Sequence, residues 1–177
     1  MIREVCGDIL LSNAHLVAHG VAPNDDFKSG LALALRQKFP ALYKDFRHWC
    51  RMRSPRPGEA WVWSGVGEAG RTVHVACLLT QEPAEHEGSH PGRAKSSYVN
   101  KALHALRKIV EHERFTSVAL PRLATGVGGL AWEEVRPLVV ASLDTLDVPV
   151  LVYTTFKKDV AADEGLAVRA KGSTARS

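Results

Sequence analysis

Between residues 2 and 156, apolar positions follow two spacings that alternate along the chain. Short, mostly apolar runs are typical of buried strands, whereas apolar residues every three or four positions are typical of a helix with one buried face. The apolar runs predict strands over 2–5, 9–11, 15–21, 59–64, 71–80, 116–120 and 148–156. The helical spacing predicts helices over 30–39, 41–49, 98–112 and 133–145.

This order of elements predicts an α/β protein in which helices cover both faces of a sheet. The strands over 59–64 and 71–80 flank a glycine-rich turn and are predicted to form a β-hairpin. In α/β sheets, ligands bind at the carboxyl ends of the strands. The loops over 22–30, 80–97 and 121–132 therefore carry the candidate binding residues.

Two stretches depart from the regular pattern. Pro137 is tolerated only in the first turn of a helix, so the helix over 133–145 is expected to start late or to kink. After Lys157 no periodicity remains, and the chain ends in Lys-Gly-Ser-Thr-Ala-Arg-Ser. We therefore expect a folded domain over 1–156 and a disordered, basic tail over 157–177.

The composition is that of one soluble globular domain. The chain has 177 residues, of which 45% are hydrophobic and 24% charged, and its formal net charge is +4. No apolar run approaches the roughly 18 residues of a membrane-spanning helix, and the first residues lack the pattern of a secretory signal. Cys6, Cys50 and Cys77 stand at unrelated spacings, which favours free thiols in a reducing compartment, the cytoplasm.

Two motif matches fail the context that their chemistry needs. The run Gly65–Gly70 satisfies G-x-G-x-x-G, but a strand follows it where a dinucleotide fingerprint requires a helix. The run His86–His90 satisfies H-E-x-x-H, but Gly88, Ser89 and Pro91 oppose the helix on which both imidazoles would face one zinc ion. We interpret the first as a hairpin turn and the second as a solvated loop, and expect no metal site.

Two loops lead into predicted helices through glycine and other small residues. They are Lys28-Ser29-Gly30 and Thr125-Gly126-Val127-Gly128-Gly129-Leu130. Glycine lets backbone N–H groups approach a ligand closely, and a helix N-terminus adds about half a positive charge. Two such junctions in one sheet fit a diphosphate held between them, although each also fits a plain tight turn. Neither loop is followed by a P-loop lysine, which disfavours an NTPase.

Four segments form a joint pattern: Gly7-Asp8-Ile9, the strand over 15–21 with its glycine-ending loop, Leu120–Trp132 and Val152–Phe156. Together they resemble a macrodomain over residues 2–156. The most specific part, P-R-L-x-T-G-x-G-G-L-x-W, is similar to the branch with the terminal ADP-ribose protein glycohydrolase and the antitoxin that removes ADP-ribose from DNA. The resemblance implies a three-layer α/β/α sandwich with a central mixed sheet, and no cofactor.

The resemblance also implies a binding site for ADP-ribose. Asp8 would accept the adenine amino group, with the Ile9 backbone and Phe156 beside the ring. The two glycine loops would wrap the diphosphate and the distal ribose, and residues 19–22 would line that ribose. The implied substrate-binding residues are Asp8, Ile9, His19, Gly20, Val21, Ala22, Lys28, Ser29, Gly30, Leu31, Pro121, Thr125, Gly126, Val127, Gly128, Gly129, Leu130 and Phe156.

Lys95, just before the helix over 98–112, is the candidate catalytic residue. In the glycohydrolase branch, a lysine ahead of a tyrosine-containing helix start is catalytic. Its amine can attack the anomeric carbon of the distal ribose and form an open-chain imine. The attack needs a neutral amine, which desolvation and the nearby positive charges of Lys28, Arg93 and the helix N-termini favour, whereas the diphosphate favours the charged form.

One position departs from the glycohydrolase pattern. The protein glycohydrolase carries an acidic partner for its lysine in the second glycine loop, where this chain has Gly128 followed by Gly129. The DNA-directed antitoxins look similar to this sequence at that place, which favours a nucleic-acid-linked substrate. Asp25 and Asp26 are alternative sources of a carboxylate, although acids in a loop before a helix are commonly just solvated.

A run of cations without any acid lies over residues 47–56. It contains Arg47, His48, Trp49, Arg51, Arg53 and Arg56. Arginines with an interleaved aromatic suit phosphate contacts and base stacking, although cations at the end of a helix are also favourable by themselves. Nucleic acid is therefore a candidate carrier of the ADP-ribose.

The expected function is an ADP-ribosyl hydrolase that removes ADP-ribose from protein Glu or Asp residues or from a DNA base, working as a monomer. Two alternatives remain at this point. One is a phosphatase acting on ADP-ribose 1″-phosphate, and the other is a non-catalytic reader of ADP-ribose.

Overall fold

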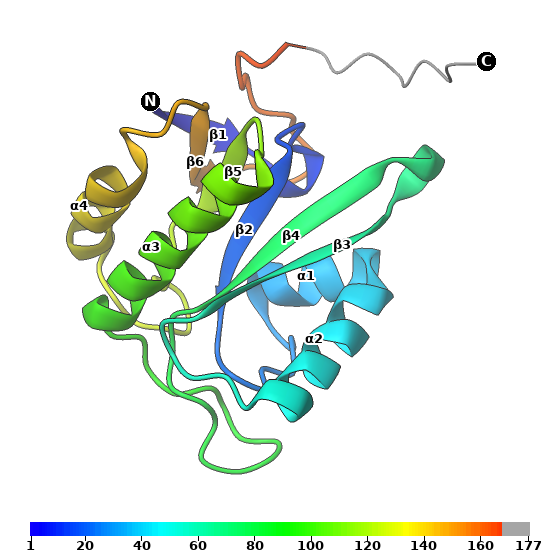
Figure 1. Ribbon diagram of the computed structural model, residues 1–177, viewed down its shortest axis with the longest axis vertical. Coiled ribbons are helices and arrows are strands. Elements are labelled where there is room, and N and C mark those ends of the chain that lie inside the picture. Colours follow the sequence, from blue (N-terminus) through cyan, green and yellow to red (C-terminus); the bar gives the residue numbers. More distant parts are fainter. Residues whose placement is uncertain (168–177) are drawn as a thin grey trace.

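A six-stranded sheet organises the protein, whose computed structural model describes residues 1–167 (Figure 1). In spatial order the strands are β1 (Ile2–Gly7), β6 (Val150–Phe156), β5 (Val118–Pro121), β2 (Leu16–Val21), β4 (Thr72–Leu79) and β3 (Ala60–Val66). Neighbouring strands are parallel except for β3, which pairs antiparallel with β4. The sheet is therefore mixed, and the carboxyl ends of its parallel strands meet at one edge.

Helices cover both faces of the sheet and complete a three-layer α/β/α sandwich (Figure 1). Their bounds are α1 (Gly30–Lys38), α2 (Pro40–Arg53), α3 (Ser96–Glu113) and α4 (Trp132–Leu143). On one face α3 and α4 bury Leu103, Leu106 and Val139 against the sheet. On the other face, α1 and α2 bury Leu35 and Phe46. The expected fold class is confirmed.

The helices begin and end where local chemistry permits. Pro40 stands at the first position of α2, where a missing N–H group costs nothing and the fixed φ suits a helix. The left-handed residues Ser54 and Arg114 end α2 and α3, each with a backbone N–H group that returns to the last turn. The helix α4 begins at Trp132 and contains Pro137, so of the two expected outcomes, a late start or a kink, the late start is not found.

Residues 9–11 form a short 3-10 helix, η1 (Ile9–Leu11), where the sequence predicts a strand. The cause is Asp8, whose carboxylate accepts a hydrogen bond from the Leu10 backbone N–H group at 3.0 Å and thereby caps the turn. The apolar run Ile9–Leu11 gives no sign of this, because it fits a short strand equally well. The turn places Asp8 at the end of β1.

The chain continues in contact with the domain beyond β6. The sequence predicts disorder from Lys157, whereas in the structure Ala162 and Leu166 pack against the apolar cluster around β1 and β6. The buried carboxylate of Glu164 also hydrogen-bonds Ser12 and Tyr153. A short segment without periodicity can pack through a few such contacts, which a pattern search does not detect. Residues 168–177 of the predicted tail lie outside the described part of the chain.

Candidate functional site

Two adjoining cavities open at the carboxyl ends of the parallel strands. The Asp8 cavity, about 450 Å³ in volume, is lined by Asp8 at the end of β1 and Phe156 at the end of β6. The glycine-loop cavity, also about 450 Å³, lies between the loops that precede α1 and α4. Residues that line both cavities are Gly30, Leu31 and Pro121. The two cavities are therefore one continuous cleft.

Asp8 is buried at the base of its cavity and is held by backbone donors. Its Oδ1 atom accepts from the Leu10 N–H group and its Oδ2 atom from the Asp159 N–H group, each at 3.0 Å. Each oxygen keeps a lone pair for a ligand, since a carboxylate oxygen accepts about two hydrogen bonds. A buried carboxylate that faces a cavity is suited to bind an amino group. Phe156 lines the same cavity and is 69% exposed, which leaves its ring open to a ligand.

His19 closes the inner wall of the glycine-loop cavity. Its Nε2 atom lies 3.2 Å from Sγ of the buried Cys77, and its Nδ1 atom has no hydrogen-bond partner among residues 1–167. Burial lowers the pKa of His19 to about 4, so the ring is neutral at physiological pH. The next residue, Gly20, lies against Thr80, whose Oγ1 atom would be 2.8 Å from an added Cβ atom. This end of β2 therefore presents a neutral imidazole and bare backbone to the cavity.

The loop before α1 forms the second wall. Gly30, the first residue of α1, has a left-handed φ of +57°, which favours glycine at this position. The side chain of Ser29 makes no capping hydrogen bond to α1, so the N–H groups of the first turn are available to an acceptor. Lys28 is exposed and pairs with Asp26 at 3.5 Å. The arrangement favours an anion at this helix N-terminus.

The loop before α4 forms the third wall and is closed by its own backbone. Leu130 donates to the Ala124 carbonyl, and Gly129 to the Gly126 carbonyl, each at 3.0 Å. At Gly128 an added Cβ atom would lie 2.6 Å from the Ala124 carbonyl oxygen and 2.9 Å from the Ala94 Cβ atom, so only glycine fits. The Ala94 N–H group donates to the Gly128 carbonyl at 3.0 Å. The glycine loop is thus joined directly to the residue before Lys95.

Lys95 lies beside the cleft with a carboxylate partner. Its Nζ atom is 3.2 Å from Oε1 of Glu82 and 5.2 Å from the centre of the Tyr98 ring. The Tyr98 hydroxyl group donates to the same Glu82 oxygen at 2.5 Å. Glu82, followed by Tyr98, raises the pKa of Lys95. The lysine is therefore charged in this state, and the cause is Glu82, which the sequence analysis did not consider.

Glu82 is held in place by the loop that carries it. Its backbone N–H group donates to the Arg93 carbonyl at 3.0 Å, and its carbonyl accepts from Gly92 at 2.9 Å. The next pair along, Gln81 and Ala94, forms an isolated antiparallel bridge. These contacts bring Glu82, at the end of β4, beside Lys95, at the start of α3.

A third cavity extends the cleft beyond the glycine-loop cavity. This cavity, which we call the Arg47 cavity, has a volume of about 530 Å³. It shares Asp25, Asp26, Lys28, Gly88, Ser89 and Pro91 with the glycine-loop cavity. Arg36, Arg47 and Arg51 line its far side. Both of the acids in the loop are engaged, since Asp25 accepts from two backbone N–H groups and Asp26 pairs with Lys28.

Trp49 does not offer the base-stacking surface that the run over 47–56 predicts. It is half-buried and stacks on Trp61, with ring centres 5.6 Å apart and planes 18° apart. The ring belongs to the apolar layer under α2. Arg51, Arg53 and Arg56 are exposed, whereas Arg47 is half-buried and donates to the Asn24 carbonyl at 3.0 Å. Exposed arginines remain available for the predicted phosphate contacts.

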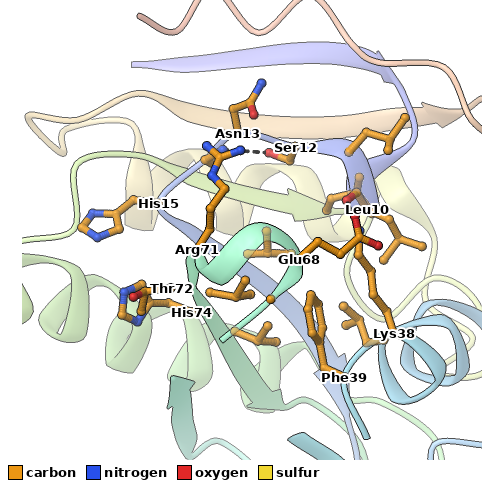
Figure 2. Close-up of a pocket in the computed structure, with 18 residues that line it drawn as sticks. Leu10, Ser12, Asn13, His15, Lys38, Phe39, Glu68, Arg71, Thr72 and His74 are labelled. Carbon is orange, nitrogen blue, oxygen red and sulfur yellow. Dashed lines mark hydrogen bonds between the residues drawn. The ribbon is translucent and has the colours of Figure 1, made fainter. Parts of the chain in front are cut away.

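A separate cavity of about 260 Å³ lies at the opposite end of β2 (Figure 2). Ser12, His15, Lys38 and Arg71 line it together with apolar residues. Ile9 is the one predicted binding residue among its lining residues. It shares Ile9 and Leu10 with the Asp8 cavity, but no residue of either glycine loop lines it.

The structure brings most of the predicted binding residues to the cleft. Those that line it are Asp8, Ile9, His19, Gly20, Lys28, Ser29, Gly30, Leu31, Pro121, Gly126, Val127, Gly128 and Phe156. Val21 is instead buried in the apolar core, Ala22 lines the Arg47 cavity, and Leu130 packs against the α3–α4 core. Thr125 donates to the Arg122 carbonyl at 2.9 Å, and Gly129 donates to the Gly126 carbonyl within the same loop.

Sequence reasoning missed Glu82, Gln81 and Tyr153. Glu82 and Gln81 follow β4 at the strand's carboxyl end, which is the signal that identifies the other loops of the site. Tyr153 carries no such signal, because it lies inside β6 and not in a loop after a strand, although it lines the Asp8 cavity.

The two rejected motifs lie in the surroundings predicted for them. Residues 65–70 form the end of β3 and the turn that joins it to the antiparallel strand β4, as a hairpin requires. Residues 86–90 lie in a loop, where Ser89 bonds the His86 carbonyl at 2.7 Å. Within residues 1–167, no helix is long and apolar enough to cross a membrane, and no cluster of three or more His, Cys, Asp or Glu side chains has the arrangement of a metal site.

Comparisons with known proteins agree with this architecture. A family model described as Macro domain matches residues 12–139. A DNA ADP-ribosyl glycohydrolase of Thermus aquaticus is 28% identical over 154 residues, which cover 86% of this chain and 41% of the relative. The ADP-ribose glycohydrolase OARD1 of Homo sapiens is 24% identical over 154 residues, which cover 86% of this chain and 91% of the relative. The chain thus spans about two fifths of the length of the bacterial relative.

Among solved structures, the macrodomain of Thermus aquaticus DarG superposes with a TM-score of 0.72. The two sequences are 26% identical, and the match covers 87% of this chain and 98% of that one.

Proposed function

The chain belongs to the macrodomain family, and on that premise we propose that it binds ADP-ribose and hydrolyses an ADP-ribosyl bond with Lys95. One observation carries the proposal. The Ala94–Gly128 hydrogen bond of 3.0 Å fastens the loop that carries Lys95 to the glycine loop of the cleft. A ligand held by that loop would then lie near the segment that carries this long, flexible lysine. The relatives named as glycohydrolases support the same reaction class.

The cleft has a suitable group for each part of ADP-ribose. The free lone pairs of Asp8 would accept the adenine amino group, and Phe156 would lie against the ring. The diphosphate would lie between the first turn of α1 and Gly126–Gly128, where backbone N–H groups and the helix dipole favour negative charge. The distal ribose would reach the end of the cleft beside His19 and Gly20.

In the reaction, Lys95 must first lose a proton. Glu82 keeps the amine protonated while the two groups stay paired at 3.2 Å, so the proton leaves to solvent once a bound substrate has separated them. The neutral amine then attacks the anomeric carbon, and the bond to the carrier breaks as the carrier leaves with a proton. Ring opening gives an imine between Nζ and that carbon, and addition of water to the imine releases ADP-ribose and restores the amine.

We propose nucleic acid as the carrier of the ADP-ribose. A conjugate bound with its adenine at Asp8 would extend past the distal ribose into the Arg47 cavity. Arg47 and Arg51 lie one helical turn apart on α2, and Arg36 faces the same space from α1. Guanidinium groups in such a row fit the repeated charges of a phosphodiester strand. The relative from Thermus aquaticus is named for DNA, whereas OARD1 is named for ADP-ribose alone.

A non-catalytic reader of ADP-ribose is the second candidate, and the state of Lys95 favours it. Its side chain is 59% exposed and paired with Glu82, and it lines neither cavity of the cleft within the described residues. Hydrolysis requires Lys95 to leave Glu82 and turn toward the ribose, whereas binding alone does not.

We propose the cytoplasm as the compartment and a monomer as the working form. Cys6, Cys50 and Cys77 are all free thiols, which suits a reducing environment.

A panel of substrates separates these candidates. The protein is incubated with ADP-ribosylated single-stranded DNA, with Glu-linked ADP-ribosyl protein and with ADP-ribose 1″-phosphate, and calorimetry measures the binding of ADP-ribose. The proposal predicts binding and release of ADP-ribose from the DNA conjugate. Binding without turnover of any conjugate selects the reader, and absence of ADP-ribose binding contradicts both.

A further inference from the structure

The segment that follows β6 folds back over the end of β1. The backbone N–H group of Lys157 donates to the Gly7 carbonyl at 3.1 Å, which completes the last pair of the two strands, Gly7 with Phe156. The chain then turns through Asp159, whose φ is +58°, and the Val160 carbonyl accepts from the Asp8 N–H group at 2.7 Å. We call residues 157–166 the C-terminal strap.

The strap fixes the side chain of Asp8 as well as its backbone. The carboxylate accepts from Leu10 on its own side and from Asp159 on the side of the strap, each at 3.0 Å. Each oxygen therefore has one fixed donor, and rotation of the carboxylate would break both bonds. The lone pairs left for a ligand keep one direction only while Asp159 stays in place.

Glu164 anchors the strap from a buried position. The residue is 8% exposed, and its Oε2 atom accepts from the Ser12 hydroxyl group at 2.6 Å and from the Tyr153 hydroxyl group at 2.9 Å. Its Oε1 atom accepts from the Asn13 N–H group at 2.8 Å. A carboxylate buried to this degree is stable only with such donors, so the three bonds hold it in one place. Ser12 and Asn13 lie at the rim of the separate cavity (Figure 2).

Through these contacts Glu164 is connected to two residues that line the Asp8 cavity, Tyr153 and Asp8. It bonds Tyr153 directly, and the ring of Tyr153 lines that cavity. It reaches Asp8 through the strap, whose approach depends on Gly7. A Cβ atom at Gly7 would lie 2.8 Å from both the Ala162 nitrogen and the Val160 carbonyl oxygen. The strap is thus packed too closely against Gly7 to move independently of Asp8.

We infer that the C-terminal strap takes part in binding the base in the Asp8 cavity, with Glu164 as the residue that positions the strap. By holding Asp8 in one orientation, the strap sets the preference for a base that presents an amino group over one that presents a carbonyl oxygen at the same place. A carboxylate held in one orientation repels such an oxygen, whereas a carboxylate that is free to rotate can turn its own oxygens away and so reduce the repulsion. This inference rests on the proposed binding of ADP-ribose.

The test compares ADP-ribose with inosine diphosphate ribose, which has a carbonyl oxygen in place of the adenine amino group. Calorimetry measures both dissociation constants for the wild type, Glu164→Ala and the matched control Asp163→Ala. The Asp163 side chain is 90% exposed and pairs only at the surface with Arg3, at 3.4 Å. Selectivity is the dissociation constant for inosine diphosphate ribose divided by the dissociation constant for ADP-ribose. If Glu164 only stabilised the fold, this ratio would not change in the folded variant.

We expect Glu164→Ala to reduce the preference for ADP-ribose by about tenfold, the scale of one hydrogen bond to a charged group, and Asp163→Ala to leave it unchanged. If Glu164→Ala does not fold, Ser12→Ala and Tyr153→Phe each remove one donor to Glu164 and should reduce the ratio in the same direction. An unchanged ratio in every folded variant overturns the inference while leaving the proposed function intact. A wild type that does not bind ADP-ribose overturns the proposed function, and this inference with it.

Discussion

Nζ of Lys95 lies 3.2 Å from Oε1 of Glu82, and the same oxygen accepts a hydrogen bond from the hydroxyl group of Tyr98. Tyr98, followed by Lys95, lowers the pKa of Glu82, and Glu82 in turn raises the pKa of Lys95. Both groups are therefore charged at neutral pH. In the proposed reaction, this pair holds the lysine as an ammonium ion until a bound substrate replaces the contact.

Glu82→Gln is predicted to move the pH dependence of catalysis. The reactive form of Lys95 is the neutral amine, so kcat/KM rises as pH increases through the pKa of Lys95. Because Glu82 raises that pKa, its removal should shift the rising limb of kcat/KM to lower pH. A pH profile of kcat/KM checks this, with the exposed loop residue Glu85→Gln as control. If the rising limb of kcat/KM lies at the same pH in Glu82→Gln and Glu85→Gln, the role given to Glu82 is contradicted.

Gly128→Ala is predicted to destabilise the glycine loop. The added Cβ atom would lie 2.6 Å from the Ala124 carbonyl oxygen and 2.9 Å from the Ala94 Cβ atom, so backbone must move. We expect a loss of about 1–3 kcal/mol in the free energy of unfolding. Gly126→Ala is the matched control, because an added Cβ atom meets nothing within 4 Å there. Equal thermal midpoints for the two variants would show that the contact of Gly128 with Ala94 is not needed.

The buried His19 is predicted to lower the free energy of unfolding in mild acid. Its pKa is about 4 in the folded protein against 6.5 in the unfolded chain, so the unfolded chain binds more protons between these values. The stability due to its neutral ring is present above pH 6.5 and is lost as pH falls toward 4. We expect about 2 kcal/mol of this loss between pH 7 and pH 5.

Urea denaturation at both pH values measures this loss. His19→Gln should flatten the pH dependence, and replacement of the exposed His104 by Gln should not. A slope that survives in His19→Gln would assign the effect to other groups.

Arg51→Gln is predicted to weaken contact with a nucleic-acid carrier without affecting ADP-ribose. Arg51 lines the Arg47 cavity, whereas Arg53, the matched control, lies at the end of α2 and outside the lining of that cavity. Each phosphate contact that is lost should raise KM for ADP-ribosylated single-stranded DNA and reduce the slope of affinity against salt by about one. Glu-linked ADP-ribosyl protein is the comparison substrate. An equal effect on that substrate, or the same salt slope in both variants, would contradict the nucleic-acid assignment.

Local chemistry explains which parts of the protein could be predicted from its sequence. The buried strands, the amphipathic α3 and the glycine loops depend on neighbours along the chain, and their patterns predicted them. Asp8 and the glycines of the cleft were found because a matching motif marks them. The state of Lys95 was not, since it depends on Glu82, thirteen positions earlier and joined to it only by folding of the loop between them.

The same limit applies to the end of the chain. Residues 157–166 have no periodicity, yet Glu164 bonds Ser12 across 152 positions. A single buried carboxylate with three donors can hold a segment that buries little apolar surface. No pattern within the segment indicates those partners, because each lies on another element.

The most direct test of the proposed function measures ADP-ribose release from ADP-ribosylated single-stranded DNA by wild type and Lys95→Ala side by side. Lys108→Ala, on the exposed side of α3, is the control. We predict that Lys95→Ala loses at least a hundredfold in kcat while its affinity for free ADP-ribose stays within about threefold of wild type. Release by Lys95→Ala at the wild-type rate would contradict the assignment of Lys95 as the catalytic residue.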